Sequence, residues 1–510
     1  MSSAQRNHGL AAAGSPRLAG PSAEAPAPEL IDAGFAWEIA DAPLLHHGLN
    51  LADLGHVLDL RERGLIPQPA AADLLRVLLE AYGTGPADFP YDSASGEVYN
   101  SRERHFVERI GDSAGWLHAG RPRREAARVA LRLLLRSQTA RLIEVGADFA
   151  STAAAVASDH AETFMGDQTY LQQAQPSTFG HYLLAFVPPA LRDGERFSAA
   201  LDQVNTSPGG AGCVNGSRLL DDRNAIADIL GFDGVIAHTR DAMWQTDVFI
   251  DLLATSASMI ANQAKLAEDL EIWSSQEFDF VDLAGPFTRA SVLMPQKRNP
   301  YSLSIIRGAS GVLIGRMSGF LAVVKSPSAR SDNLIFAYGE IPRALDFTIR
   351  VSALTSGVVR TLTVNAERMW SELERGFAQA TDLAEYVMVA AGVDYRTAYH
   401  VVGQAVRAAS GRGLRGLDIT ADLLDDAAQE VCGRRFGLDP AALAEALDPR
   451  RIVATRRATG GASPGEVRSM AEEFSDHAAS LRAGAVEALK GYAEAEERLV
   501  SRARELASPS

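Results

Sequence analysis

Apolar residues recur at helical spacing over long stretches of this chain. Between Asp241 and Ser275, Val248, Leu252, Met259 and Leu266 are 4 or 7 positions apart, as on one buried face of a helix. No proline interrupts this stretch, so the pattern predicts one helix of about 35 residues, or about 50 Å at 1.5 Å per residue. Such a helix is too long for a compact monomeric core and indicates an elongated bundle that is completed by other subunits.

Other segments carry the same periodicity. The pattern predicts companion helices at Ser177–Val204 and Ser302–Val324. It also predicts a small helical unit at Leu44–Ala87, with a break at Gly64–Pro69. The charged, alanine-rich stretch Pro464–Ala507 predicts a long terminal helix. Strand patterns are scarce, so the predicted fold class is all-α with a long central helix bundle.

Changes in composition divide the chain. Residues 1–28 are rich in Ala, Ser, Pro and Gly and lack the continuous apolar core of a signal peptide, which predicts a disordered leader. After about Val364 the helices become shorter and glycine and proline punctuate them. We therefore predict an N-terminal helical domain at 29–125, the central long-helix bundle at 126–364, and a C-terminal helical domain at 365–510.

The overall charge narrows the class of protein. The 49 Lys and Arg against 64 Asp and Glu give a formal net charge of -15, which argues against a nucleic-acid partner. No run approaches the roughly 18 to 20 apolar residues of a membrane helix. Two cysteines, Cys213 and Cys432, rule out a disulfide framework, are not spaced as a metal pair, and suit a reducing compartment. The expectation is a soluble cytoplasmic enzyme without a metal site.

The loop Arg289–Pro300, RASVLMPQKRNP, concentrates polar chemistry in a few residues. Ser291 can donate or accept a proton, Lys297 supplies a fixed positive charge, and Asn299 offers donors to a carboxylate. Its two prolines exclude a helix. The segment is equipped to hold an anion beside a proton-transfer group; the alternative is an ordinary polar connection between two helices.

A second region, Tyr99–Ala126, is basic within an acidic protein. Arg121, Arg123 and Arg124 follow Gly120, and guanidinium groups there can bind a ligand carboxylate in a bidentate manner. The alternative is a solvated basic turn.

A third region, MGDQTYLQQAQPSTFGHYLLAF, places Thr169 and Gln175 ahead of a helix expected to begin near Ser177. Further on, residues 208–217 (PGGAGCVNGS) do not follow a strand as a dinucleotide-binding fingerprint would. We interpret them as a flexible loop able to close over a site.

Together these segments resemble argininosuccinate lyases of the fumarase/aspartase superfamily. Residues 290–299 resemble the serine loop of that superfamily, and both LQQAQP at Leu171–Pro176 and TDLAEYVMVAAGVDYRTAYHVVGQAV at Thr381–Val406 are similar to argininosuccinate lyase. Matching segments run from about Tyr99 to about Val406, and they occur in the order of the family.

The resemblance implies a homotetramer with a core of about twenty helices and active sites built from loops of three subunits. It implies that Ser291 is the base that removes the proton next to a carboxylate, and that Lys297 and Asn299 hold the dianionic intermediate. Arg123 and Arg124 fall in the segment that binds the fumaryl carboxylates, with Thr169 and Gln175 as further substrate-binding residues. The reaction is the cleavage of an N-substituted aspartate to fumarate and an amine, or its reverse, and it needs no cofactor.

Two departures from the family pattern affect proton transfer. The family has Thr-His where this chain has Thr169 and Tyr170, and the glutamate that usually pairs with that histidine maps to Ser304. The chain therefore either moves its protons differently or has abandoned the reaction. Tyr170 could serve as a general acid, or it could simply fill the space.

A third departure concerns the amine. Arg330 and Ile335 stand where argininosuccinate lyases carry the Tyr and Gln that contact the arginine tail. With Arg102 and Arg124 also basic, a pocket that these residues face would repel a guanidinium, so we predict a neutral or anionic amine other than arginine, in a specialised pathway. Arg124 could instead bind a fumaryl carboxylate, and Arg102 and Arg330 could lie on the surface. The alternatives are argininosuccinate lyase proper, a lyase with another leaving group such as a nucleotide amine, and a catalytically inactive structural or regulatory relative.

Overall fold

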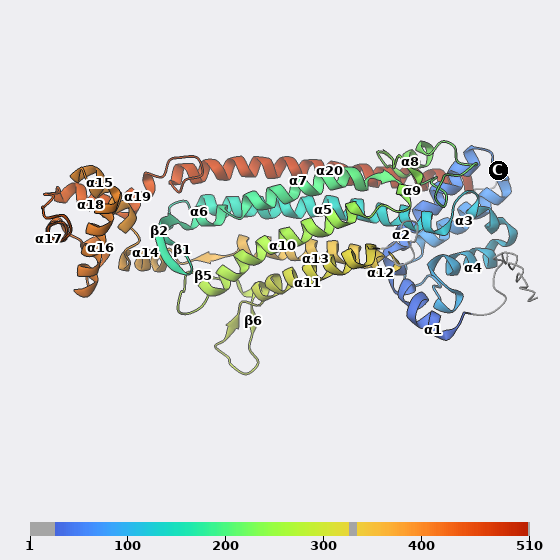
Figure 1. Cartoon of the computed structure of the whole chain (residues 1–510). Coiled ribbons are helices and arrows are strands. Elements are labelled where there is room, and N and C mark those ends of the chain that lie inside the picture. Colours follow the sequence, from blue (N-terminus) through green and yellow to red (C-terminus); the bar gives the residue numbers. More distant parts are fainter. Residues whose placement is uncertain (1–25, 326–333, 508–510) are drawn as a thin grey trace, which may run out of the picture.

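The computed structural model describes residues 26–325 and 334–507, and its long helices lie side by side in one elongated bundle (Figure 1). The all-α prediction is confirmed, because the strands are few and short. The bundle consists of α5 (Arg123–Asp159), α7 (Val187–Val204), α10 (Asp247–Trp273), α11 (Tyr301–Val324) and α13 (Glu340–Arg360). Within the described ranges, no helix is both long and apolar enough to cross a membrane.

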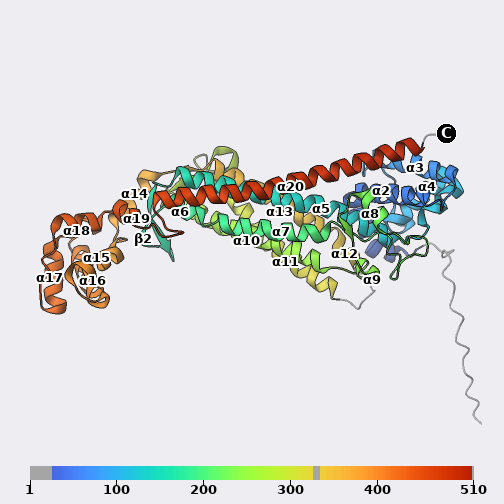
Figure 2. The same ribbon diagram turned by 90° about the horizontal axis from the view of Figure 1, so that it is seen from above.

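One helix runs along the whole length of the bundle. α20 (Pro464–Ala507) has 44 residues, which make about 66 Å at 1.5 Å per residue, and it packs along α5. Figure 2 shows it linking the two ends of the bundle. The predicted terminal helix is confirmed with the same bounds.

A helical unit covers the end of the bundle where α5 begins. It contains α1 (Pro28–Leu30), a π-helical turn (Ile31–Phe35), α2 (Ala36–Glu62), α3 (Gln68–Gly83), α4 (Val98–Ile110), and 3-10 turns at Ser93–Ser95 and Gly111–His118. The break expected at Gly64–Pro69 lies between α2 and α3, and their leucines form a second buried cluster. The expected leader lies, up to residue 25, outside the described residues.

Shorter helices form the opposite end (Figure 1). They are α14 (Ala366–Arg375), α15 (Ala380–Ala391), α16 (Tyr395–Gly411), a 3-10 turn (Gly416–Asp418), α17 (Ala421–Cys432), α18 (Pro440–Leu447) and α19 (Pro449–Ala454). They enclose a third apolar cluster of their own. The domain boundaries at 125 and 364 stay predictions.

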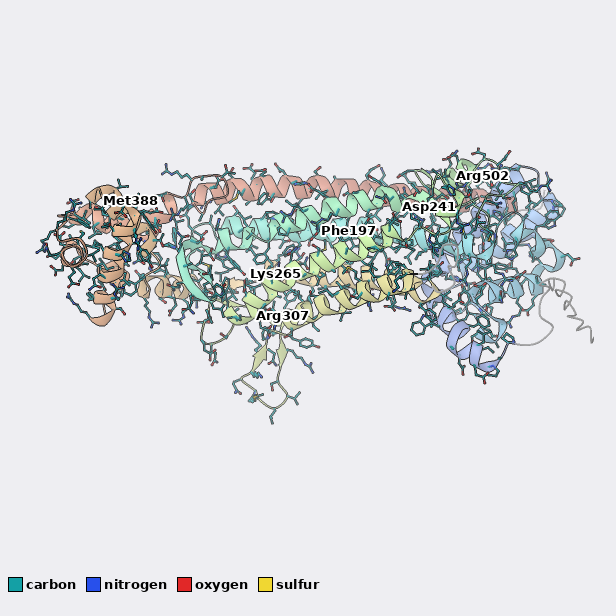
Figure 3. All side chains as sticks on the ribbon, viewed as in Figure 1. Phe197, Asp241, Lys265, Arg307, Met388 and Arg502 are labelled. Atoms are coloured by element: carbon teal, nitrogen blue, oxygen red, sulfur yellow. The ribbon has the colours of Figure 1, made fainter. Side chains whose placement is uncertain are left out.

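Small residues allow close packing inside the bundle. Many alanines of α5 are fully buried, and Phe197 of α7 points into the interior (Figure 3). At Gly48 of α2, a Cβ atom would lie 2.6 Å from the carbonyl oxygen of Ala130 in α5. Only glycine permits the two backbones to approach so closely there.

Besides the helices, the described residues form four two-stranded sheets. β1 (Phe164–Thr169) pairs with β2 (Gln172–Thr178), and β6 (Arg289–Ala290) pairs with β7 (Arg298–Asn299), both antiparallel. The others are β3 (Thr206–Ser207) with β4 (Gly234–Val235), which is parallel, and β5 (Val281–Asp282) with β8 (Thr363–Val364), which is antiparallel. The β1–β2 and β6–β7 hairpins carry candidate site residues.

Two helices predicted from the sequence are longer than the helices of the structure. α10 begins at Asp247, because α9 (Thr239–Ala242) ends in a turn and Thr246 has a non-helical φ of -132°. The stretch 177–204 splits into β2, α6 (Phe179–Leu184) and α7, whose first turn contains Pro188 and Pro189. Prolines lack the amide donor that would continue a helix from the preceding turn, so the break falls there. The helix predicted at Ser302–Val324 is confirmed as α11.

Candidate active site

The loop containing Ser291 is the tip of the β6–β7 hairpin, which projects from the side of the bundle (Figure 1). The backbone N–H of Ser291 donates to the carbonyl of Lys297 at 3.2 Å, which closes the base of the loop. The tip is open to solvent, and Leu293 is 85% exposed. The prediction of a non-helical loop is confirmed.

The hydroxyl oxygen of Ser291 accepts two backbone hydrogen bonds, from the N–H of Leu293 at 3.3 Å and from that of Met294 at 3.0 Å. Both donors point at the oxygen that would carry negative charge after loss of its proton. Such donors stabilise an alkoxide relative to a hydroxyl, so the local fold favours use of this oxygen as a base.

Lys297 and Asn299 complete the loop. The ammonium of Lys297 is exposed, and no hydrogen bond or ion pair joins it to the described part of the chain. Asn299 donates from its side-chain amide to the carbonyl of Arg289 at 3.0 Å, which leaves its oxygen and one N–H for a ligand. Arg298, which lies between them in the sequence, instead forms an ion pair with Asp282.

Thr169, Tyr170 and Gln175 belong to the β1–β2 hairpin rather than to a loop before a helix. The helix expected near Ser177 begins at Phe179, because Thr178 still pairs with Phe164 in the sheet and then caps α6. Tyr170 and Leu171 form the tip with φ of +54° and +58°. Non-glycine residues are strained in this left-handed region. A two-residue type I′ hairpin turn requires positive φ at both of its central positions, so the turn accounts for this conformation, and Tyr170 is 98% exposed at the tip.

Arg123 and Arg124 open α5 at the other end of the bundle. Arg123 donates to the side chain of Asn100 and lies 3.5 Å from Glu97. Arg124 lies 3.3 Å from Glu38. Both guanidinium groups are therefore held by side chains of the N-terminal unit, with Arg123 the more exposed.

The third arginine of this region has a structural role. Arg121 is buried and donates to Asp53 at 2.6 Å, and Arg102 donates to the other oxygen of Asp53 at 2.7 Å. Desolvation opposes the charge of Asp53, but these two guanidinium groups hold its pKa below the ordinary value. The sequence left two locations open for Arg102, the amine pocket and the surface; it occupies neither, because it is fully buried in the ion pair with Asp53. Arg330 lies outside the described residues.

One chain does not bring these regions together. α5 separates Arg123 from the β1–β2 hairpin by 37 residues, or about 55 Å. α11 similarly separates the serine loop from α12 (Ile335–Tyr338) by 24 residues, or about 36 Å. α12 packs on α2 beside Arg124. A site that uses both ends needs a second chain.

Ser304 occupies the position of the family's glutamate, and a carboxylate from another helix lies beside it. Ser304 donates its hydroxyl proton to Glu271 of α10 at 3.2 Å, and Arg307 pairs with the same carboxylate. Figure 3 shows Arg307 near the start of α11, beside α10. Sequence reasoning did not single out Glu271, because residues 33 positions apart meet only through the packing of α10 on α11.

The glycine-rich segment 208–217 is anchored over its first half. Gly210 and Gly212 donate their backbone N–H groups to the two oxygens of Glu125, at 2.7 and 2.6 Å. Residues 207–212 are buried. The expectation of a freely moving loop is therefore wrong for this half, and Glu125 is a second residue that the sequence did not single out.

Comparison with known proteins identifies the family to which the chain belongs. The family model described as Lyase matches residues 59–315, and the one described as Argininosuccinate lyase C-terminal matches residues 377–454. The argininosuccinate lyase of Methanothermobacter thermautotrophicus is 30% identical over 88% of this chain and 97% of its own length. That of Methanoculleus marisnigri is 32% identical over 90% of this chain and 92% of its own length.

Solved structures agree. A variant of EDDS lyase with bound fumarate superimposes with a TM-score of 0.84 at 26% identity, covering 95% of this chain and 97% of that chain. The 3-carboxy-cis,cis-muconate lactonizing enzyme of Pseudomonas putida, at 18% identity and a TM-score of 0.68 over 89% of this chain and 99% of that chain, shares the fold.

Proposed function

Since this chain belongs to the lyase family of the fumarase/aspartase superfamily, as an argininosuccinate lyase-like member, we propose how its residues perform the reaction and on which amine. The chain is a carbon–nitrogen lyase that forms fumarate. The proposed substrate is an N-substituted aspartate whose amine is not arginine, and the reverse addition of that amine to fumarate uses the same site.

The pair of backbone donors on Ser291 is the observation that carries the proposal. The Ser291 alkoxide, stabilised by the N–H groups of Leu293 and Met294, removes the proton next to a substrate carboxylate. The electron pair moves onto that carboxylate, and Lys297 and Asn299 stabilise the dianion. Collapse of the dianion breaks the carbon–nitrogen bond and leaves fumarate.

The leaving amine needs a proton, and Tyr170 is the proposed donor. Its position at an exposed hairpin tip suits a side chain that enters the site of another subunit. Arg123, Arg124, Thr169 and Gln175 are the proposed contacts to the substrate carboxylates.

Assembly into a homotetramer with shared sites follows from the same reasoning. α11 exposes apolar side chains along its length, among them Ile305, Val312, Ile314 and Leu321. Gly308, Gly311, Gly315 and Gly319 on the same helix have open space beside them. An apolar helix face with small residues is suited to close packing against other copies, which would bring the serine loop to a second chain's Arg123.

The exclusion of arginine rests on Ile335. It stands where argininosuccinate lyases carry a glutamine, and its own side chain offers no acceptor to a guanidinium. Argininosuccinate lyase proper remains the second candidate, favoured by the identity to the archaeal enzymes.

The test is fumarate release from a panel of N-succinyl compounds that includes argininosuccinate, monitored beside the Ser291→Ala variant. Release from another N-succinyl amine, abolished by the substitution, is the expected result. Efficient cleavage of argininosuccinate alone would favour the second candidate. No release or uptake of fumarate with any amine would indicate a catalytically inactive relative.

A further inference from the structure

A small cavity of about 30 Å³ lies between α2, α4, α5 and α12, beside Arg124. Its charged and polar lining comes from Glu38, Asp41, Glu97, Arg124 and Tyr338, with Ile335 on an apolar wall. The cavity thus adjoins the residue proposed to contact the substrate. It has room for about two water-sized groups.

Two buried polar atoms of this lining lack a partner among the described residues. Asp41 is 5% exposed; its Oδ1 accepts from Arg343 and the backbone of Gly339 lies beside the carboxylate, whereas its Oδ2 has no partner with hydrogen-bond geometry among the described residues. The Tyr338 hydroxyl is likewise unpaired on a side chain that is 7% exposed, with its ring 5.3 Å from the Arg128 guanidinium. Unpaired buried groups of this kind are unfavourable, and a ligand that pairs with them relieves the cost.

The lining favours a cation. Three carboxylates and one guanidinium face the cavity. Each carboxylate has an arginine partner at its edge, Arg343 for Asp41, Arg124 for Glu38 and Arg123 for Glu97. Burial raises the pKa of Asp41, although Arg343 and the backbone N–H of Gly339 oppose the shift, so the charged carboxylate is disfavoured unless a further positive group lies beside it. A positive group at Oδ2 would complete that compensation.

Resting on the function proposed above, we infer that the amine substrate carries a second nitrogen as a primary ammonium group, and that this ammonium ends in the cavity. It donates to Asp41 Oδ2 and contacts the Tyr338 hydroxyl. An ammonium has one non-hydrogen atom and fits a space for about two water-sized groups, whereas a guanidinium has four and does not. This class of amine differs from the neutral or anionic one predicted from the sequence, which assumed that Arg102, Arg124 and Arg330 face the site.

The experiment measures kcat/KM for addition to fumarate of three amines of similar length: 1,3-diaminopropane, butylamine and β-alanine. The wild-type enzyme is expected to prefer the diamine. Asp41→Asn is expected to lower kcat/KM for the diamine by about 10- to 100-fold, as for loss of a charged hydrogen bond, while the value for butylamine and the KM for fumarate stay near wild type. Asp346→Asn, which removes an exposed carboxylate paired with Arg350, is the matched control and should keep the preference.

Because Asp41→Asn also disturbs the ion pair with Arg343, Tyr338→Phe provides a second variant that removes only a hydroxyl. It should lower the preference for the diamine over butylamine without changing the melting temperature. A wild-type preference for β-alanine or butylamine, or an unchanged preference in both variants, would overturn the inference and leave the lyase function standing. Failure of every amine and every N-succinyl compound would overturn the proposed function, and the inference with it.

Discussion

At the scale of single residues, Ser291 shows how a short loop prepares a weak base. A free serine hydroxyl holds its proton far above neutral pH, but two backbone N–H groups are already aimed at its oxygen. We predict that Ser291→Ala lowers turnover by at least about 10²- to 10⁴-fold, the usual loss for a proton-transfer group, and leaves the melting temperature unchanged because the side chain is on an exposed loop.

Steady-state fumarate release and a thermal melt check this prediction. Ser410→Ala, an exposed serine on α16, is the matched control and should keep full activity. Turnover near the wild-type value in the Ser291 variant would show that another group is the base.

At Tyr170, proton donation by the hydroxyl can be tested separately from the space that the ring fills. Tyr170→Phe keeps the ring and removes the hydroxyl, so we predict a loss of turnover with no loss of stability. Substrates with better leaving groups should lose less activity, because they need less protonation. If the phenylalanine variant retains wild-type turnover on all substrates, Tyr170 merely fills space.

The buried carboxylate of Glu125 binds the glycine-rich segment 208–217. Burial raises its pKa from 4.5 to about 7, although the N–H groups of Gly210 and Gly212 and the charge of Arg121 oppose the shift. A raised pKa means that the folded protein binds this proton more tightly than the unfolded chain. The stabilisation is therefore complete below about pH 4.5 and is lost as pH rises through about 7, by about 3 kcal/mol in all.

We predict that Glu125→Gln flattens the pH dependence of the free energy of unfolding between pH 5 and pH 8, since the amide cannot titrate. Urea unfolding at a series of pH values measures it. Glu108→Gln, at an exposed carboxylate on α4, should leave the slope unchanged. An identical slope in the Glu125 variant would show that the carboxyl is ionised throughout this range.

At the scale of elements, the crossing of α2 and α5 depends on one missing side chain. A Cβ at Gly48 would lie 2.6 Å from a backbone oxygen of Ala130, and backbone cannot rotate away as a side chain can. We predict that Gly48→Ala lowers the free energy of unfolding by about 1 to 3 kcal/mol, as for other overpacked interiors.

Chemical denaturation checks this value. Gly484→Ala on α20 is the control, because the space beside Gly484 is open and alanine has the higher helix propensity. The control should be neutral or stabilising. Equal stability of the Gly48 variant and the wild type would mean that the helices can separate at little cost.

At the scale of the whole molecule, the length of the bundle decides how a site is made. α5 holds Arg123 about 55 Å from the end where the β1–β2 hairpin begins, and no flexible link shortens this distance within one chain. We predict a solution mass near four chains by light scattering. Mixing inactive Arg123→Ala and Ser291→Ala enzymes should then restore part of the activity, because some sites receive both intact residues from different subunits.

Subunit exchange is verified first with differently tagged chains. As a control, a mixture of two preparations of the Ser291→Ala enzyme should stay inactive. Exchange without any recovery of activity would contradict sites that combine Arg123 of one chain with Ser291 of another.

The sequence by itself determined the local features. Helical periodicity gave α11 and α20 nearly to the residue, and the two prolines and polar residues of 289–300 defined a loop with Ser291, Lys297 and Asn299. These features depend on neighbours in the chain, which is why a pattern can report them. The family resemblance then supplied the reaction class, which the comparisons support.

Only the tertiary structure decided which distant residues meet. It placed Arg102 in a buried pair with Asp53 instead of a substrate pocket, set Glu271 beside Ser304, tied Glu125 to Gly210, and left Asp41 Oδ2 without a partner at a cavity. Each of these contacts joins segments that are dozens of residues apart. Burial and pairing fix the charge and role of such groups, and neither property can be read from spacing along the chain.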